Sequence, residues 1–346
     1  MEAIRAAAGD IVGNAPGDIV GNAPGGIACR AAGYNLRLYP DPRCEEFRAA
    51  AAGYFGLKKE QVFAGNGSDE ILAFCFPAFF NPDDPILFPD IGYSFYPVYA
   101  DFNRQQYRNV FLDDDFRIPV EAFMQPNGGI IFANPNAPTG ICLPLKDVRR
   151  ILDGNPDVAV IIDEAYVEFG GESAAGLIDH YPNLLVVQTL SKSRSLAGLR
   201  VAVALGHEDL ITALDMVKNS FNSYTMDRLA LAGGTAAFGD TGHLKESCRK
   251  IIATRERIRA ELLKLGAKVI DSSANFLFIG FPGVPGSELQ EKLRGKGILV
   301  RHFNAPRIDG FVRVSIGTDD EMDAFLKVIH EVIHEAVHEA IHETLN

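Results

Sequence analysis

The stretch TLSKSRSLAGLR, residues 189–200, decides the fold, and it directly follows the apolar run Leu184–Thr189. A lysine at the carboxyl end of a buried strand points into the crevice where α/β sheets bind ligands. There, desolvation and neighbouring cations are expected to lower the pKa of Lys192, so that its amine can act as a nucleophile. Ser191 and Arg200 add a hydroxyl group and a positive charge, which suit a phosphate. For this stretch alone, the competing interpretation is an exposed lysine in a polar turn.

Other apolar runs alternate with helical stretches in the way that a parallel α/β sheet requires. Several of these runs lack polar alternation, which suits strands buried on both faces. The runs expected to form strands are residues 86–88, 129–133, 158–162, 184–189 and 201–205.

The pattern changes after about Gly239 to a long charged helix, residues 244–265, and then to shorter strands at 275–279, 298–301 and 311–315. We therefore predict an α/β protein whose large domain holds a mostly parallel sheet of the seven-stranded type, followed by a smaller α+β domain. The expected boundaries are 1–35 for an N-terminal arm, 36–238 for the large domain and 239–346 for the small domain.

The composition of the 346 residues, 47% hydrophobic with a net charge of −12, is that of an ordinary enzyme and argues against nucleic acid or an anionic membrane as partner. No apolar run reaches the roughly 18 residues that a membrane span needs, and no signal peptide is recognised. The five cysteines lack metal-binding or disulfide-framework spacing. A cytoplasmic location is therefore expected.

A carboxylate follows the apolar run 158–162, in the sequence Asp163-Glu164-Ala165-Tyr166. Such a carboxylate can pair with a pyridinium nitrogen and keep it protonated, and Tyr166 could donate to a phenolic oxygen of the same ring. Alone, the motif could equally be a strand-end aspartate that caps the next turn.

Two glycine-containing turns complete the set of motifs. The turn NPNAPTG, residues 134–140, follows another buried run and would place amide groups beside a ligand. The segment GNGSDE, residues 65–70, precedes a helical stretch, so its backbone N–H groups would form an anion site at a helix N-terminus. Either could instead be a turn or cap without a ligand.

Taken in order, these four features resemble the fold-type-I pyridoxal-phosphate aminotransferases, over about residues 36–325. The histidinol-phosphate aminotransferase family is the most similar. The segments that carry this resemblance are LYPDP (38–42), GNGSDE (65–70), DEAYVEF (163–169), TLSKSRSLAGLR (189–200) and VRVSIGT (312–318).

The resemblance implies pyridoxal 5′-phosphate as cofactor, with Lys192 forming the Schiff base, Asp163 pairing with the pyridine nitrogen and Tyr166 bonding the phenolic oxygen. It also implies further cofactor contacts. Ser68, Asp69, Ser191 and Arg200 would hold the phosphate, and Tyr93 would stack on the ring.

The resemblance also assigns the substrates. Arg313 would bind the α-carboxylate of the amino acid, and Tyr39 would reach the neighbouring subunit's site, which implies a homodimer. Arg301 and Tyr39 are the candidates for a substrate phosphate. The implied reaction transfers the amino group of L-histidinol phosphate to 2-oxoglutarate. Aromatic amino-acid transamination and threonine-phosphate decarboxylation on the same fold remain alternatives.

The chain departs from the family pattern in two places. Ala137 stands where many relatives have an asparagine that bonds the phenolic oxygen, and Asn136 is the candidate replacement. In place of the usual Asn-Glu-Asn-Pro arm, the segment GDIVGNAP occurs twice, at residues 9–16 and 17–24.

A four-residue repeat, VIHE-VIHE-AVHE-AIHE, occupies residues 328–343 and contains three overlapping HExxH strings. Histidines four residues apart share a helix face and can chelate a metal, so a metal-binding protein is the alternative from another class. A non-catalytic relative that oligomerises through its repeats is a third. We favour a plain helix extension without a metal, because one unbroken helix supplies neither a third ligand nor a cleft.

Overall fold

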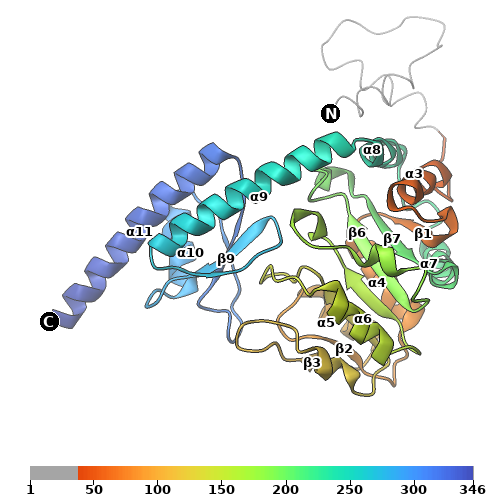
Figure 1. The fold of residues 1–346 in the computed structure, drawn as a ribbon, viewed down its shortest axis with the longest axis horizontal. Helices are drawn as coiled ribbons and strands as arrows, with labels where there is room; N and C mark the ends of the chain where they lie inside the picture. The colour runs from red at the N-terminus through yellow and green to blue at the C-terminus, as the bar shows by residue number, and fades with distance from the viewer. Residues whose placement is uncertain (1–37, 346) are drawn as a thin grey trace, which may run out of the picture.

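The computed structural model describes residues 38–345, with side chains described up to residue 335. The predicted N-terminal arm with its GDIVGNAP repeat, and the side chains of His338 and His342, lie outside these described residues. Two sheets lie at opposite ends of a long helix, α9 (Thr241–Lys264), as Figure 1 shows.

The larger sheet has seven strands in the order β1-β7-β6-β5-β4-β2-β3. Strand β7 is antiparallel to both of its neighbours, and the remaining pairs are parallel. The prediction of a mostly parallel α/β sheet is therefore confirmed. The strands are β1 Val62–Gly65, β2 Ile86–Pro89, β3 Tyr107–Val110, β4 Gly129–Ala133, β5 Val160–Asp163, β6 Leu184–Thr189 and β7 Ala202–Gly206.

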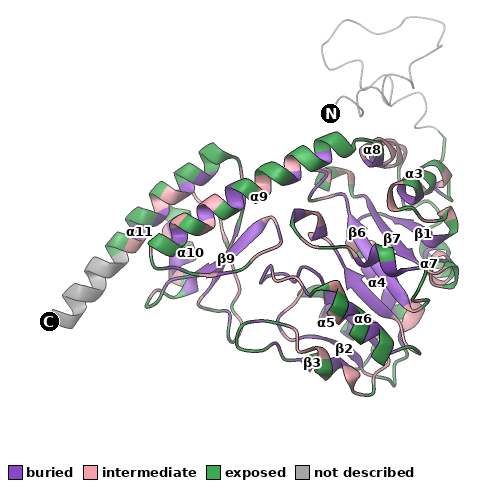
Figure 2. Ribbon diagram, in the orientation of Figure 1, coloured by how far each residue is buried: buried purple, intermediate pink, exposed green. Residues whose placement is uncertain are grey.

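Alternate side chains of each central strand pack on opposite faces of this sheet. In β4, Ile130 and Phe132 join one apolar cluster while Ile131 joins the other. Figure 2 shows the strands buried between helices whose outer surfaces are exposed. The helices are α3 Glu45–Phe55, α6 Leu145–Gly154 and α8 Arg228–Gly239 on the first cluster, and α4 Ser68–Phe79, α5 Phe95–Phe102 and α7 Glu208–Phe221 on the second.

The smaller sheet has four antiparallel strands in the order β10-β11-β9-β8. Its apolar face packs against α9, α10 (Gly286–Gly295) and α11 (Asp319–Leu345). The strands are β8 Lys268–Ile270, β9 Phe276–Gly280, β10 Arg301–His302 and β11 Val312–Ser315.

The expected strand at residues 298–301 is wrong in most of its length, because β10 begins only at Arg301. The preceding residues end helix α10 instead. Gly297 has a φ of 84°, and the Ile298 N–H group donates to the Leu293 carbonyl, as in a left-handed helix end. Strands β1, β3 and β8 were not among the expected runs; β3, at the sheet edge, is mostly exposed and polar.

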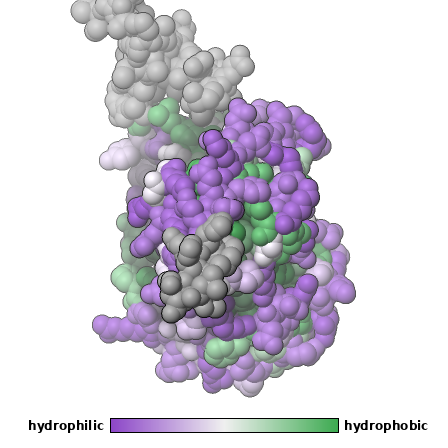
Figure 3. All heavy atoms as spheres, turned by 90° about the vertical axis from the view of Figure 1, so that its left-hand side faces the viewer, coloured by the Kyte–Doolittle hydropathy of each residue, from purple (hydrophilic) through white to green (hydrophobic). Residues whose placement is uncertain are grey.

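The C-terminal repeat is helical, as expected, since it continues α11 to Leu345. Of the described residues on the face of the molecule shown in Figure 3, most are hydrophilic, and hydrophobic residues form small areas between them. Among the described residues, no three His, Cys, Asp or Glu side chains gather in a group that could hold a metal ion. No helix within residues 38–345 is long and apolar enough to cross a bilayer.

Candidate active site

Four of the sequence motifs emerge at one edge of the large sheet. Strands β4, β5 and β6 are parallel and in register, with Ala133 beside Asp163 and Asp163 beside Val187. Strand β1 runs in the same direction, because β7 is antiparallel to both β1 and β6. The NPNAPTG, DEAY, Lys192 and GNGSDE segments therefore all follow strands at this edge, which is where α/β sheets bind ligands.

Asp163, the last residue of β5, is a buried carboxylate, and the residue is only 5% exposed. Tyr96 donates its hydroxyl hydrogen to Asp163 Oδ2 at 3.2 Å, and the Ala165 N–H group donates to Oδ1 at 3.2 Å. Burial raises the pKa of Asp163 to about 6, although these two hydrogen bonds and the Lys192 charge act in the opposite direction. A cationic ring nitrogen would find a ready partner here.

Lys192 lies in the loop after β6, with its Nζ 5.6 Å from the centroid of the Tyr166 ring. Desolvation and the nearby charge of Arg313 lower the pKa of Lys192, with a further contribution from Arg200. Both effects favour the neutral amine, which is the nucleophilic form. Tyr166 itself packs edge-on against Phe276, with ring centroids 5.1 Å apart.

The N-terminus of α4, at Ser68, is suited to bind an anion. The first N–H groups of a helix have no partner within the helix, and they attract negative charge. The Arg200 guanidinium lies beside them, 3.1 Å from Asp69 Oδ2. Gly67 has a φ of 84°, and a Cβ there would come within 2.5 Å of Arg200 Nη2, so only glycine fits without displacing that cation. In the same loop as Lys192, the Ser191 hydroxyl oxygen accepts a hydrogen bond from Thr189.

The Asp69 carboxylate is engaged by protein groups rather than free. It accepts a hydrogen bond of 2.6 Å from the Tyr93 hydroxyl group, besides its ion pair with Arg200. Asp69 thus orients Arg200 and Tyr93. The Tyr93 ring also lies edge-on to Tyr96, with centroids 5.5 Å apart.

The hydrogen bonds of Asn136 differ from the expected ones. Its amide nitrogen donates both hydrogens to protein groups, the Ile91 carbonyl and the Thr139 hydroxyl oxygen, each at 3.0 Å. Donation to a phenolic oxygen would require one of these bonds to break. The neighbouring Ala137 packs against Ala274 and Phe276, so it offers only an apolar contact.

Two arginines of the small sheet lie directly opposite each other, Arg301 on β10 and Arg313 on β11. Both guanidiniums are close to the Phe303 ring, at 5.6 Å and 5.8 Å from its centroid, and Arg313 is also 5.0 Å from the Phe276 ring. Within the described residues neither makes an ion pair with a carboxylate. Both are therefore available to an anionic ligand, and Arg313 is close enough to Lys192 to act on its charge.

Tyr39 does not join this group of residues. It is 76% exposed, and its ring stacks on Tyr224 with centroids 4.6 Å apart. Arg228 holds the backbone here by donating to the Leu38 and Tyr39 carbonyls at 3.2 and 2.9 Å. The Tyr39 side chain thus lies on the surface of the chain.

Sequence reasoning missed two supporting contacts. Tyr96, the donor to Asp163, is one of three tyrosines spaced by three residues, and that helical spacing with Tyr93 and Tyr99 was a usable signal. Glu168 accepts a hydrogen bond from Ser193 and lies 3.6 Å from Arg194. This second contact joins the Asp163 segment to the Lys192 loop, and no local pattern indicates it.

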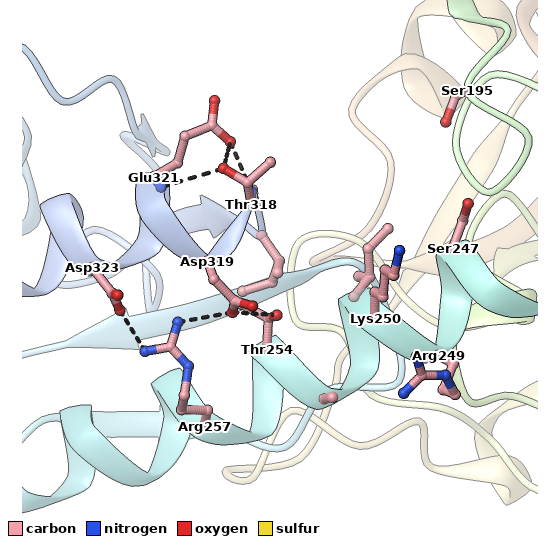
Figure 4. Close-up of a pocket in the computed structure, with 14 residues that line it drawn as sticks. Ser195, Ser247, Arg249, Lys250, Thr254, Arg257, Thr318, Asp319, Glu321 and Asp323 are labelled. Atoms are coloured by element: carbon pink, nitrogen blue, oxygen red, sulfur yellow. Dashed lines mark hydrogen bonds and ion pairs between the residues drawn. The ribbon is translucent and has the colours of Figure 1, made fainter.

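A cavity of about 1040 Å³ lies elsewhere, between α9 and the start of α11 (Figure 4). Its walls carry charges of both signs, which are largely paired, as in the contacts of Arg257 with Asp319 and Asp323. Ser195 of the Lys192 loop lines it, but neither Lys192 nor Asp163 does. The cavity is thus separate from the predicted site.

The sheet topology and the residues at its edge together define a fold-type-I aminotransferase. The chain belongs to the aminotransferase class I and II family, which matches residues 12–329. It is 52% identical to histidinol-phosphate aminotransferase 1 of Pseudomonas aeruginosa over 296 residues, 86% of this chain and 84% of that protein. It is also 52% identical to the histidinol-phosphate aminotransferase of Clostridium acetobutylicum, over 87% of this chain and 86% of that one.

Solved structures agree on the fold. The histidinol-phosphate aminotransferase of Sinorhizobium meliloti, in complex with pyridoxal-5′-phosphate, superposes with a TM-score of 0.81 at 25% identity, covering 91% of this chain and 88% of that one. The L-threonine-O-3-phosphate decarboxylase of Porphyromonas gingivalis has a TM-score of 0.76 at 20% identity, covering 87% and 93%. The predicted family and fold are therefore confirmed.

We predict that Asp163→Asn stabilises the cofactor-free protein at neutral pH. The carboxyl ionises near pH 3.8 when unfolded, but burial raises its pKa to about 6 in the folded state. The free energy of unfolding thus falls as the pH rises from about 3.8 to about 6. Above pH 6 the wild type has lost about 3 kcal/mol of this free energy. Thermal unfolding at about pH 3.5 and pH 8 measures this. Asp157→Asn, at an exposed position, is the control. A lower Tm for Asp163→Asn at pH 8 would contradict the prediction.

Proposed function

We propose that this chain is a pyridoxal-phosphate-dependent transaminase that moves the amino group of L-histidinol phosphate to 2-oxoglutarate. The observation that carries the proposal is the position of the Lys192 amine, whose pKa is lowered. It lies at the same sheet edge as the buried Asp163 carboxylate and the N-terminus of α4 with Arg200 beside it. The 52% identity to curated histidinol-phosphate aminotransferases over most of the chain supports the substrate.

The residues present fit the cofactor at each of its polar groups. The first turn of α4 from Ser68, with Ser191 and Arg200, suits the phosphate, and Asp163 suits the ring nitrogen. Tyr166 and Lys192 lie together on the remaining side, for the phenolic oxygen and the aldehyde. When bound, pyridoxal phosphate supplies an electron sink for the bonds at the substrate Cα. Residues 36–238 would form the domain that holds it, and residues 239–346 the small domain.

The side chains of the chain divide the remaining work. The Asp163 carboxylate keeps a ring nitrogen protonated, and Tyr96 holds that carboxylate in place. Lys192 Nζ, whose lowered pKa favours its neutral form, would take the proton from the substrate Cα as a general base and return it, as a general acid, to the carbon two bonds away. Tyr93, fixed through Asp69, packs against the ring face.

The two substrates differ in their anionic groups, which gives the two arginines separate tasks. Histidinol phosphate has a phosphate and no carboxylate, whereas glutamate has two carboxylates. Arg313, the nearer charge to Lys192, is assigned to the α-carboxylate of glutamate. Arg301 is assigned to the substrate phosphate, together with Tyr39 of a second copy of the chain.

A homodimer is part of the proposal, and the exposed position of Tyr39 supports it. Its side chain is 76% exposed, and other exposed apolar side chains lie on the neighbouring segment. Tyr224 stacks on Tyr39, and Phe221 (74% exposed) and Met216 (68% exposed) lie on the adjoining helix α7. Covering such a patch is the ordinary reason for its existence on an enzyme surface.

A cytoplasmic location is part of the proposal. The four cysteines within the described residues are free thiols, as a reducing compartment maintains them. Fractionation of the native host that recovers the protein with a periplasmic or extracellular marker would exclude this location.

We predict that the purified protein reacts with histidinol phosphate faster than with phenylalanine or threonine phosphate. Single-turnover rates of the cofactor-loaded protein, followed by the change in cofactor absorbance, measure the preference. Lys192→Ala should lose the absorbance band that borohydride removes from the wild type. A preference for phenylalanine would reject the substrate and leave the transaminase, whereas carbon dioxide release from threonine phosphate would indicate the decarboxylase.

We predict that Arg313→Ala slows the glutamate half-reaction about 100-fold at low substrate, since a charge-assisted hydrogen bond contributes up to about 3 kcal/mol. The histidinol-phosphate half-reaction should change much less. Arg301→Ala is the matched variant from the opposite position on β10, and it should show the reverse preference. Equal losses in both half-reactions for both variants would contradict the division.

We predict that Phe221→Glu weakens self-association, because it places a charge at an exposed apolar side chain three residues before Tyr224, on which Tyr39 stacks. Sedimentation velocity over a range of concentrations measures the shift from dimer to monomer. Phe102→Glu, at an equally exposed phenylalanine on α5, is the control. A wild-type protein that sediments as a monomer would reject the homodimer.

A further inference from the structure

Arg307 lies in the loop between β10 and β11, the two strands that carry Arg301 and Arg313. Its backbone has a φ of 71°, in the left-handed region that side-chain-bearing residues seldom adopt. Such a conformation persists only where surrounding contacts fix it, and it is concentrated at functional positions. The contacts of Arg307 are therefore the ones to follow.

The Arg307 side chain crosses from the small-sheet side of the molecule to the large-sheet side. Its Nη1 donates to Asp90 Oδ2 at 3.2 Å, and its Nη2 donates to the carbonyls of Leu112 and Asp113 at 2.9 and 2.5 Å. The guanidinium also lies 5.7 Å from the Phe116 ring centroid. One planar cation thus binds three acceptors that are more than 190 residues away in sequence, which a lysine could not match in geometry.

The acceptor side of this contact is itself rigid. Asp90 is only 12% exposed at its side chain, and its Oδ1 accepts the Leu112 N–H group at 2.8 Å. Beneath the ion pair, apolar side chains from both sides form one cluster. Its buried members are Ile91, Leu112, Phe116, Ile270, Phe278, Ile308 and Phe311. The loop of Arg307 therefore cannot shift without disturbing the Asp90 segment.

The Asp90 segment leads directly to the cofactor site. Tyr93 follows three residues later, and the Ile91 carbonyl between them accepts the Asn136 amide hydrogen at 3.0 Å. At its other end, Arg307 lies six residues from Arg301 and six from Arg313. The Arg307–Asp90 contact is thus a short connection between the ring-packing tyrosine and the substrate arginines.

We propose that Arg307 is a positioning residue, which fixes the distance between the two substrate-binding guanidiniums and the cofactor ring without touching either ligand. This inference rests on the proposed function, since it takes Arg301 and Arg313 as the groups that bind substrate anions. It gives the Asn136 amide a role as well, because Asn136 holds the Ile91 carbonyl in the same segment.

The test compares Arg307→Ala, Arg307→Lys and Asp90→Ala with the wild-type holoenzyme. A misplacement of about 1 Å lowers the rate of a bound reaction by up to about 100-fold. Displaced guanidiniums also hold the substrate anions less well, so we expect KM to rise at least tenfold for both substrates. Equilibrium dialysis with glutarate, a dicarboxylate that cannot react, should show the same weakening as the KM for glutamate. The dissociation constant of pyridoxal phosphate from the apoprotein should stay within about threefold of the wild type.

The Arg307→Ala and Asp90→Ala effects should not add in the double variant, because both remove one contact. Arg257→Ala is the matched control, since Arg257 is similarly exposed and pairs with two aspartates, but both lie on α11 rather than across the two sheets. Its KM values should stay at the wild-type level.

Three results would overturn the inference: unchanged KM and glutarate affinity in Arg307→Ala and Arg307→Lys, loss of pyridoxal phosphate affinity in parallel with KM, or additive effects in the double variant. Failure of the proposed function is seen separately, because a wild-type protein that does not turn over histidinol phosphate fails before any variant is made. In that case glutamate and glutarate still measure the effect of Arg307.

Discussion

The parallel register of β4, β5 and β6 is the constraint on which the site depends. Because Ala133, Asp163 and Val187 lie side by side, the loops after β4 and β5 begin level with each other, and β6 continues only to Thr189 before the Lys192 loop begins at the same edge. The sheet is buried on both faces. A slip of one residue would turn every side chain of a strand to the opposite face and remove it from the apolar cluster in which it packs. The packing of the core therefore sets the relative positions of the carboxylate and the amine.

Burial shifts the pKa values of the two ionisable groups at this edge in opposite directions. It disfavours charge on both, so the pKa of Asp163 rises to about 6 while the pKa of Lys192 falls. Arg313 lowers the lysine pKa further from the small sheet, and Tyr96 limits the rise for the carboxylate. The same environment thus shifts Lys192 toward its neutral amine and still permits a carboxylate on Asp163 at neutral pH, which suits proton transfer at a substrate carbon.

The parts predicted from sequence are those whose position a strand end decides. Lys192 and Asp163 each follow an expected apolar run within a few residues, and the α4 N-terminus was recognised from the GNGSDE turn although strand β1 before it was not expected. Contacts between distant segments left no such signal, as in Tyr96 with Asp163 or Arg307 with Asp90. Residues 298–300 were assigned to a strand because they are apolar, although a left-handed glycine commits them to the end of α10. The amide of Asn136 was assigned from its position beside Ala137, and only the structure shows both its hydrogens in use.

Helix α9 runs unbroken for 24 residues between the two sheets (Figure 1), a rod of about 36 Å at 1.5 Å per residue. Arg255, midway along it, donates to the carbonyls of Phe169 and Ala274, so the rod is held to the DEAY side and to the start of β9 together. A rod of this length magnifies rotation: a tilt of about 5° at Asp240 carries its far end through roughly 3 Å. A small change in the angle of α9 beside α8 is therefore enough to move the part of the small sheet at its far end by about the length of a hydrogen bond.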